Sequence, residues 1–203
     1  MAPLDKECIA AGADLAPATL VAAYRRGLFP MRVERGVLGW WSPNPRGVLP
    51  LDGFIVHRSL ARAERRFEIR IDSEFVAVMR ACGDPARPHG WIDESFVAAY
   101  TELFTMGWAH SVEAWRDDIL VGGVYGIAIG AFFAGESMFH LERDASKVAL
   151  HALVEHLRTQ AFTLFDVQWT TPHLRSLGAQ DVLRHEYLDL LDRAVTEPTR
   201  WSA

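Results

Sequence analysis

Residues 122–147 constrain the fold more than any other stretch, because the pattern changes halfway along them. The first half is apolar and punctuated by glycine, with Gly130 where a hairpin can turn. This predicts two short strands, the second ending near Gly135, followed by a polar corner at residues 136–139. From Asp144 onward, apolar side chains recur at helical spacing, which predicts a long amphipathic helix.

A second constraint is the apolar stretch at residues 164–168, which follows the predicted helix and reads as a strand. Its two polar side chains, Asp166 and Gln168, are two positions apart, and the period of a strand predicts that they share one face. If this strand lies beside the strand ending at Gly135, then Glu136, Asp166 and Gln168 line one crevice. We take that crevice as the candidate site.

Composition sets outer limits on the class of protein. The chain has 203 residues, of which 50% are hydrophobic and 23% charged, enough for one core or for a core with a small companion domain. Two cysteines, Cys8 and Cys82, exclude a disulfide framework and a cysteine-based zinc site. His151 and His156 lie five apart, which is wrong for an i, i+4 zinc pair. We therefore expect no metal.

Targeting signals are also missing from the pattern. No apolar run approaches the roughly 20 residues that span a bilayer. Residues 1–12 carry neither a basic start nor a long apolar segment, so we expect a cytoplasmic protein without membrane contact.

Two tryptophans and two prolines at residues 40–45 mark a change of element, since no regular element accommodates prolines that close together. We place a domain boundary here, with residues 1–45 forming a small N-terminal domain and residues 46–203 the larger one. Antiparallel strands in the middle of the chain and a helical crossover before Asp166 predict a mixed α/β sheet. Ser73 and Asp93 are the predicted N-caps of two intervening helices.

A basic stripe is expected on the helix at residues 58–66, because Arg58, Arg62, Arg65 and Arg66 fall on one side. A solvated face explains such a stripe as well as contact with nucleic-acid phosphates does. The formal charge of -5 argues weakly against a general nucleic-acid coat protein.

Eight short motifs follow one another along the chain. They are YRRGLFP (24–30), WWSPNPR (40–46), GWI (90–92), HSVEAW (110–115), LVGGVYG (120–126), GESMF (135–139), ASK (145–147) and SLGA (176–179). Each is weak alone, but the ordered set closely resembles the leucyl/phenylalanyl-tRNA–protein transferases. The resemblance implies a small N-terminal domain packed on an acetyltransferase-like (GNAT) domain.

The resemblance also implies a reaction. The aminoacyl group of leucyl- or phenylalanyl-tRNA, and less well methionyl-tRNA, passes to the α-amine of a protein that begins with Arg or Lys, marking it for degradation. The α-amine has a pKa of roughly 7.7–8.0, so a useful fraction is neutral near pH 7. Aminolysis of this activated ester requires no metal, cofactor or covalent nucleophile.

Site residues follow from the same resemblance. Asp166 and Gln168 would hold and polarise the attacking amine and the ester carbonyl, and Glu136 would lie near the acceptor. The transferred side chain would enter a pocket formed by Val124, Met138, Leu150, Leu153 and Phe165. Trp91 and Tyr100 would hold the terminal adenosine by stacking, and the arginine stripe would contact tRNA. The family's tryptophan after Phe-Pro is replaced by Met31, which stacks on a purine less well.

Other interpretations stay open at this point. An acyl-CoA-dependent GNAT transferase would require a glycine-rich pyrophosphate loop, yet residues 143–147 contain no glycine. A non-catalytic tRNA-binding module would use the same basic stripe and aromatic residues. A serine hydrolase is disfavoured because residues 135–139 lack the second glycine of a nucleophile elbow. Asp166 alone would also suit a structural carboxylate at a strand end.

Overall fold

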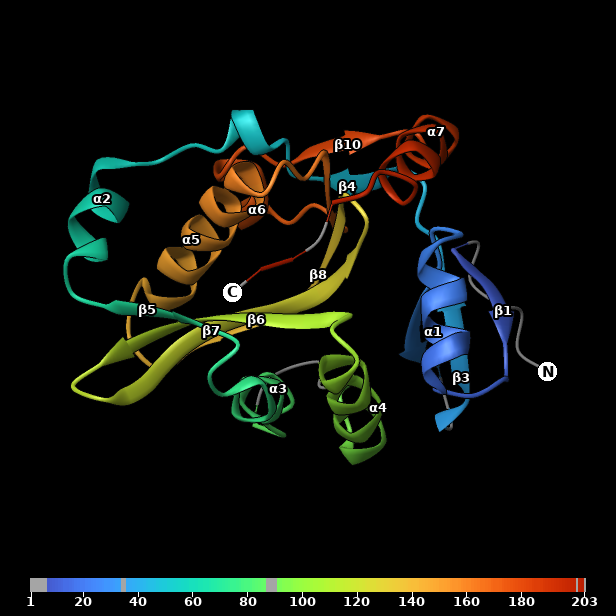
Figure 1. The fold of residues 1–203 in the computed structure, drawn as a ribbon, viewed down its shortest axis with the longest axis horizontal. Coiled ribbons are helices and arrows are strands. Elements are labelled where there is room, and N and C mark those ends of the chain that lie inside the picture. Colours follow the sequence, from blue (N-terminus) through green and yellow to red (C-terminus); the bar gives the residue numbers. More distant parts are fainter. Residues whose placement is uncertain (1–6, 34–35, 87–90, 200, 203) are drawn as a thin grey trace.

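The computed structural model describes residues 7–33, 36–86, 91–199 and 201–202. These residues build two β-sheets that lie side by side (Figure 1). The smaller sheet has the order β1-β3-β2, and the larger has the order β10-β4-β9-β8-β7-β6-β5. The expected mixed α/β sheet, preceded by a smaller N-terminal sheet, is confirmed.

The small sheet is antiparallel and is packed by one helix. Its strands and helix are β1 (Cys8–Ala11), β2 (Phe29–Arg32), β3 (Leu38–Trp41) and α1 (Pro17–Tyr24). Leu20 and Tyr24 of α1 are buried together with Trp40 of β3. The helix is followed by Gly27 at φ +73°, a conformation that glycine adopts without steric cost.

The large sheet carries the candidate site. Its strands are β4 (Arg46–Val48), β5 (Glu68–Ile71), β6 (Ala109–Arg116), β7 (Ile119–Ile129), β8 (Phe132–His140), β9 (Leu164–Gln168) and β10 (Gln180–Val182). Its neighbours pair antiparallel except for β8 and β9, which are parallel. The chain leaves the small sheet at Trp41 and enters the large one at Arg46, the interval in which we predict the domain boundary.

Helices cover both faces of the large sheet (Figure 1). They are α2 (Arg58–Glu64), α3 (Phe75–Cys82), α4 (Glu94–Thr105), α5 (Ala145–Thr159), α6 (Pro172–Ser176) and α7 (Arg184–Ala194), with a 3-10 turn, η2 (Leu51–Gly53). α5 is the crossover between the parallel strands β8 and β9, as such a connection requires. Among the described residues, no helix has the length and apolar character needed to cross a membrane.

Two local predictions are wrong. β8 does not end near Gly135 but continues to His140, because β7 pairs with it up to the partners Gly122 and His140. Ser73 does not cap α3. The N-cap of α3 is Glu74, whose side chain makes no capping hydrogen bond. The backbone N–H of Glu74 donates to Glu113 Oε1 at 2.8 Å.

The predicted cap of α4 is confirmed. Asp93 accepts hydrogen bonds from the backbone N–H groups of Ser95 and Phe96, which satisfies two of the free donors at the helix start.

Candidate active site

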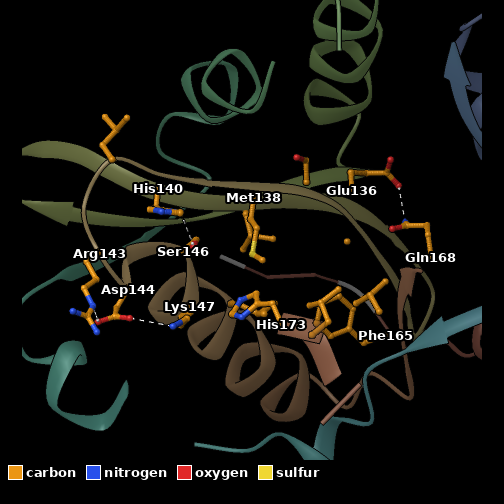
Figure 2. Close-up of a pocket in the computed structure, with 17 residues that line it drawn as sticks. Glu136, Met138, His140, Arg143, Asp144, Ser146, Lys147, Phe165, Gln168 and His173 are labelled. Carbon is orange, nitrogen blue, oxygen red and sulfur yellow. Dashed lines mark hydrogen bonds and ion pairs between the residues drawn. The ribbon is translucent and has the colours of Figure 1, made fainter. Parts of the chain in front are cut away.

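A cavity of about 750 Å³ lies between β8, β9 and the start of α5 (Figure 2). The parallel pairing of β8 with β9 sets Ala134 opposite Asp166, so the residues that follow in each strand lie close together. Glu136 and Gln168 occupy one end of the cavity, and Arg143 and Lys147 occupy the other. The expectation that β8 and β9 together form a crevice agrees with this arrangement.

Gln168 reaches the cavity because the backbone turns at the end of β9. Its φ is +55°, which interrupts the alternation of side chains along a strand. Its side-chain Nε2 donates to Glu136 Oε1 at 3.4 Å, while its backbone N–H donates to Asp166 Oδ1 at 2.9 Å. Gln168 therefore lines the cavity, whereas Asp166 does not. The prediction that both share one face is wrong.

Asp166 is fully buried and is engaged by other side chains. Its carboxylate accepts from Arg46 Nε at 2.8 Å and Arg46 Nη2 at 2.5 Å, and from the Tyr187 hydroxyl at 2.9 Å. These contacts leave no room for the attacking amine. The expectation that Asp166 itself touches the substrate is therefore corrected. Its carboxylate supports the backbone that turns Gln168 into the cavity.

Sequence reasoning gave Arg46 no role, although Arg46 lies within the motif at residues 40–46. Its guanidinium is 1% exposed and donates through Nη1 to the carbonyl of Gly27 at 2.9 Å. It also lies over the rings of Phe29 and Tyr187, 4.9 and 4.5 Å from their centroids. A single arginine at the start of an otherwise apolar stretch, residues 46–49, was the available signal.

Glu136 is partly buried at the cavity wall, and its carboxyl group has a pKa raised to about 8. Burial is the main cause of the raised pKa, opposed by a hydrogen bond with the Tyr24 hydroxyl. The charge of Asp166 raises the pKa further, and Arg46 lowers it. The Tyr24 hydroxyl also lies 2.5 Å from that of Tyr100. Glu136 therefore changes its protonation state near neutral pH.

The apolar wall agrees in most positions with the predicted side-chain pocket. Val124, Met138, Leu150 and Phe165 line the cavity. Leu153 does not line it; its side chain is fully buried in the core cluster around α5.

The predicted adenosine contacts do not line the cavity, although the Tyr100 hydroxyl reaches Glu136. Met31, Trp91 and Tyr100 belong to the core cluster that includes α3 and α4, not to the cluster around α5. Tyr100 is fully buried, so its ring offers no face to a base, and the predicted stacking role of Tyr100 is wrong. Trp91 is half-buried and packs edge-on against Phe96 at 5.1 Å. Gly90, part of the motif at residues 90–92, lies outside the described residues.

The predicted arginine stripe starts on α2 and is exposed at all four positions, Arg58, Arg62, Arg65 and Arg66. Within the part of the chain that the structure describes, no ion pair involves the first three. Arg66 lies 3.5 Å from the Asp144 carboxylate and donates to the Arg143 carbonyl at 3.2 Å. The stripe therefore touches the loop that precedes α5. Over the same residues, no group of three or more His, Cys, Asp or Glu gathers to hold a metal ion.

The fold and the cavity define an α/β protein with a small N-terminal domain and a substrate-sized site beside the parallel strand pair. Two family models match it: leucyl/phenylalanyl-tRNA protein transferase over residues 48–192, and the N-terminal domain of the same transferase over residues 13–44. The chain belongs to the leucyl/phenylalanyl-tRNA protein transferase family.

Curated relatives agree with the family models. A leucyl/phenylalanyl-tRNA–protein transferase of Thiobacillus denitrificans is 49% identical over 94% of this chain and 85% of its own length. One from Paramagnetospirillum magneticum is 50% identical over 90% of each chain. A solved GCN5-related N-acetyltransferase from Kribbella flavida covers 82% of this chain and 61% of its own, at 15% identity and a TM-score of 0.45.

Proposed function

We propose that this protein transfers the aminoacyl group of leucyl- or phenylalanyl-tRNA, and less well methionyl-tRNA, to the α-amine of proteins that begin with Arg or Lys. Such a tag marks the acceptor for degradation, and the use of charged tRNA implies a cytoplasmic setting. One observation carries the proposal: the Glu136–Gln168 pair lies at the end of a cavity with an apolar wall.

The apolar wall selects the donor. Val124, Met138, Leu150 and Phe165 offer a lining suited to an unbranched or aromatic side chain. Met138 adapts its thioether to several shapes, and one methylene changes affinity by only about 1–3 kcal/mol. Discrimination between leucine, phenylalanine and methionine is therefore modest.

The reaction is an aminolysis of the aminoacyl ester. The neutral acceptor nitrogen attacks the ester carbonyl carbon and a C–N bond forms. The bond from that carbon to the ribose oxygen breaks, and the ribose oxygen takes up the proton that the nitrogen loses. Gln168 donates its amide N–H to Glu136, so its amide oxygen is left to accept a hydrogen bond from the attacking amine. Holding the two reactants in place supplies several kcal/mol of the barrier reduction, of the order of 7–11 kcal/mol at most.

Glu136 explains why the acceptor protein begins with a basic residue. An ionised carboxylate here pairs with the cationic first side chain of an acceptor through charge-assisted hydrogen bonds. A bound cation favours the ionised form of Glu136, so binding of an Arg or Lys acceptor is coupled to loss of its proton.

Asp166 and Arg46 act as positioning residues in this proposal. Their ion pair fixes the start of β4 against the end of β9, directly before the turn at Gln168.

The deciding experiment mixes purified protein, tRNA charged with radiolabelled leucine, and peptides that differ only in a first residue of Arg, Lys or Ala. Transfer to the Arg and Lys peptides but not to the Ala peptide supports the proposal. Binding of tRNA without transfer would favour the non-catalytic module, and transfer from an acyl-CoA instead would favour the other acyltransferase class.

A further inference from the structure

The end of the cavity away from Glu136 and Gln168 has no part in the reaction above, and it is basic. Its lining includes four side chains, which we call the basic end: His140, Arg143, Lys147 and His173. They come from β8, the loop after it, α5 and α6. Figure 2 shows Arg143, Asp144 and Lys147 at the end of the cavity opposite Gln168, with His173 between Lys147 and Phe165.

Negative charge at the basic end does not balance the positive charge. Of the described residues that line it, Asp144 is the one carboxylate. Asp144 lies 3.2 Å from Lys147, 3.8 Å from Arg143 and 3.5 Å from Arg66. Three cations thus share one anion.

The neighbouring carboxylate does not change this balance. Glu142 is absent from the cavity lining and pairs with Arg116 on β6 at 2.7 Å.

The basic groups are close enough to repel one another. The pKa of His173 is lowered, first by burial and then by the charges of Lys147 and His140. An anion at this position would relieve that repulsion and would find donors on several sides.

We propose that the basic end binds phosphate groups of the 3′-terminal strand of the donor tRNA. This rests on the proposed function and adds a phosphate subsite to it. Lys147 and Arg143 donate to phosphate oxygens, while the aminoacyl end of the same strand reaches the apolar wall at Met138 and Phe165.

Continuity with the arginine stripe favours RNA over a small phosphate ligand. Arg66 belongs to the stripe and contacts both Arg143 and Asp144 of the cavity rim. Cationic side chains therefore run from the exposed face of α2 into the cavity. A polyanionic strand can contact both regions at once, whereas the pyrophosphate of a coenzyme A can occupy only the cavity.

The experiment compares two donors that carry the same amino acid, phenylalanyl-tRNA and 3′-phenylalanyl-adenosine, the second of which contains no phosphate. In the variant Arg143→Gln/Lys147→Gln, KM for phenylalanyl-tRNA should rise roughly tenfold relative to KM for phenylalanyl-adenosine, since each lost contact is a hydrogen bond to a charged group. The slope of log affinity for tRNA against log salt should fall by about 0.7 per contact for a single strand.

Arg158→Gln is the matched control, because it removes the same charge from the far end of α5, where Arg158 pairs with Glu155 at 2.9 Å. It should leave the ratio of the two KM values unchanged. An equal rise for both donors in the double variant, or no rise for either, would overturn the subsite.

A second variant is expected to change the affinity for tRNA in the opposite direction. Asp144→Asn removes the shared carboxylate, and asparagine tolerates the left-handed φ of +72° at this position. It should tighten tRNA binding several-fold, an outcome that general damage to the loop does not produce; weaker binding counts against the proposal.

A third measurement separates the subsite from the proposed function. If the wild-type protein transfers from neither donor, the function fails, and binding of an uncharged RNA oligonucleotide ending in CCA still decides the subsite. Coenzyme A is then added as a competitor for the bound oligonucleotide. If it displaces the oligonucleotide equally well from the wild type and from the double variant, RNA is supported as the ligand of the basic end. If the double variant still binds the oligonucleotide but coenzyme A no longer displaces it, the RNA subsite is refuted.

Discussion

Arg46 and Asp166 form a buried ion pair that joins the first strand of the large sheet to the strand carrying Gln168. Two guanidinium nitrogens of Arg46 lie 2.8 and 2.5 Å from the two carboxylate oxygens of Asp166. The third guanidinium nitrogen holds the Gly27 carbonyl, which follows α1 in the small domain. One side chain therefore ties the N-terminal domain to the strand that ends in the candidate site.

Breaking this pair from one side should destabilise the protein. Arg46→Met leaves the Asp166 carboxylate buried without its cation, and such a loss costs about 3–5 kcal/mol of unfolding free energy. Urea unfolding followed by circular dichroism measures it. The double variant Arg46→Met/Asp166→Leu should recover part of the loss, because neither charge is then buried alone. Additive losses in the double variant would show that the two residues do not act as a pair.

Removing the amide that faces the cavity should affect turnover more than donor binding. Gln168→Ala deletes the acceptor for the attacking amine but leaves its backbone hydrogen bond to Asp166 in place. We expect kcat to fall by about 10²-fold or more, with KM for aminoacyl-tRNA within a few-fold of wild type, because the lost group positions the reactants. Val167→Ala on the same strand also lines the cavity and serves as the control for local packing. Equal losses in tRNA affinity would contradict the assignment.

Protonation of Glu136 should give the stability a characteristic dependence on pH. Its carboxyl pKa is about 8 in the folded protein and 4.5 at its ordinary value. Between these values the folded state binds more protons than the unfolded state, so this group makes stability fall as pH rises from about 4.5 to 8. Glu136→Gln should flatten that decline, which thermal unfolding at several pH values would show. An identical pH dependence in the variant would remove Glu136 as its source.

The same variant should distinguish acceptors. Glu136→Gln removes the charge that pairs with a basic first residue, so KM for an Arg peptide should rise roughly tenfold or more. KM for the donor should stay within twofold in the same steady-state assay, because Glu136 contacts the acceptor in our proposal. A larger effect on the donor would place the acceptor elsewhere.

The arginine stripe should contribute a salt-dependent part of tRNA affinity. Arg62→Ala combined with Arg66→Ala should weaken tRNA binding. It should also reduce the slope of log affinity against log salt by about two, since two phosphate contacts are lost. Fluorescence anisotropy at several salt concentrations measures both. The pair Arg158→Ala and Arg193→Ala removes equal charge from other exposed positions. An unchanged slope in the stripe variant would mean that the stripe is only a solvated face.

The sequence by itself determined several elements of the large sheet and four residues of the apolar cavity wall. Apolar periodicity indicated the long helix now seen as α5, and the short apolar run indicated β9, because local pattern and propensity carry that information. The ordered motifs led to the family, and they identified Val124, Met138, Leu150 and Phe165 as pocket residues.

Only the tertiary structure decided which polar groups face the cavity. A positive φ at Gln168 reverses the face expected from strand alternation. Arg46, which is 120 positions away in the sequence, forms an ion pair with the Asp166 carboxylate. Burial likewise decided that Tyr100 holds a hydroxyl near Glu136 and offers no stacking surface. Contacts between residues remote in the chain, and the protonation that burial imposes, depend on how strands pair and not on local pattern.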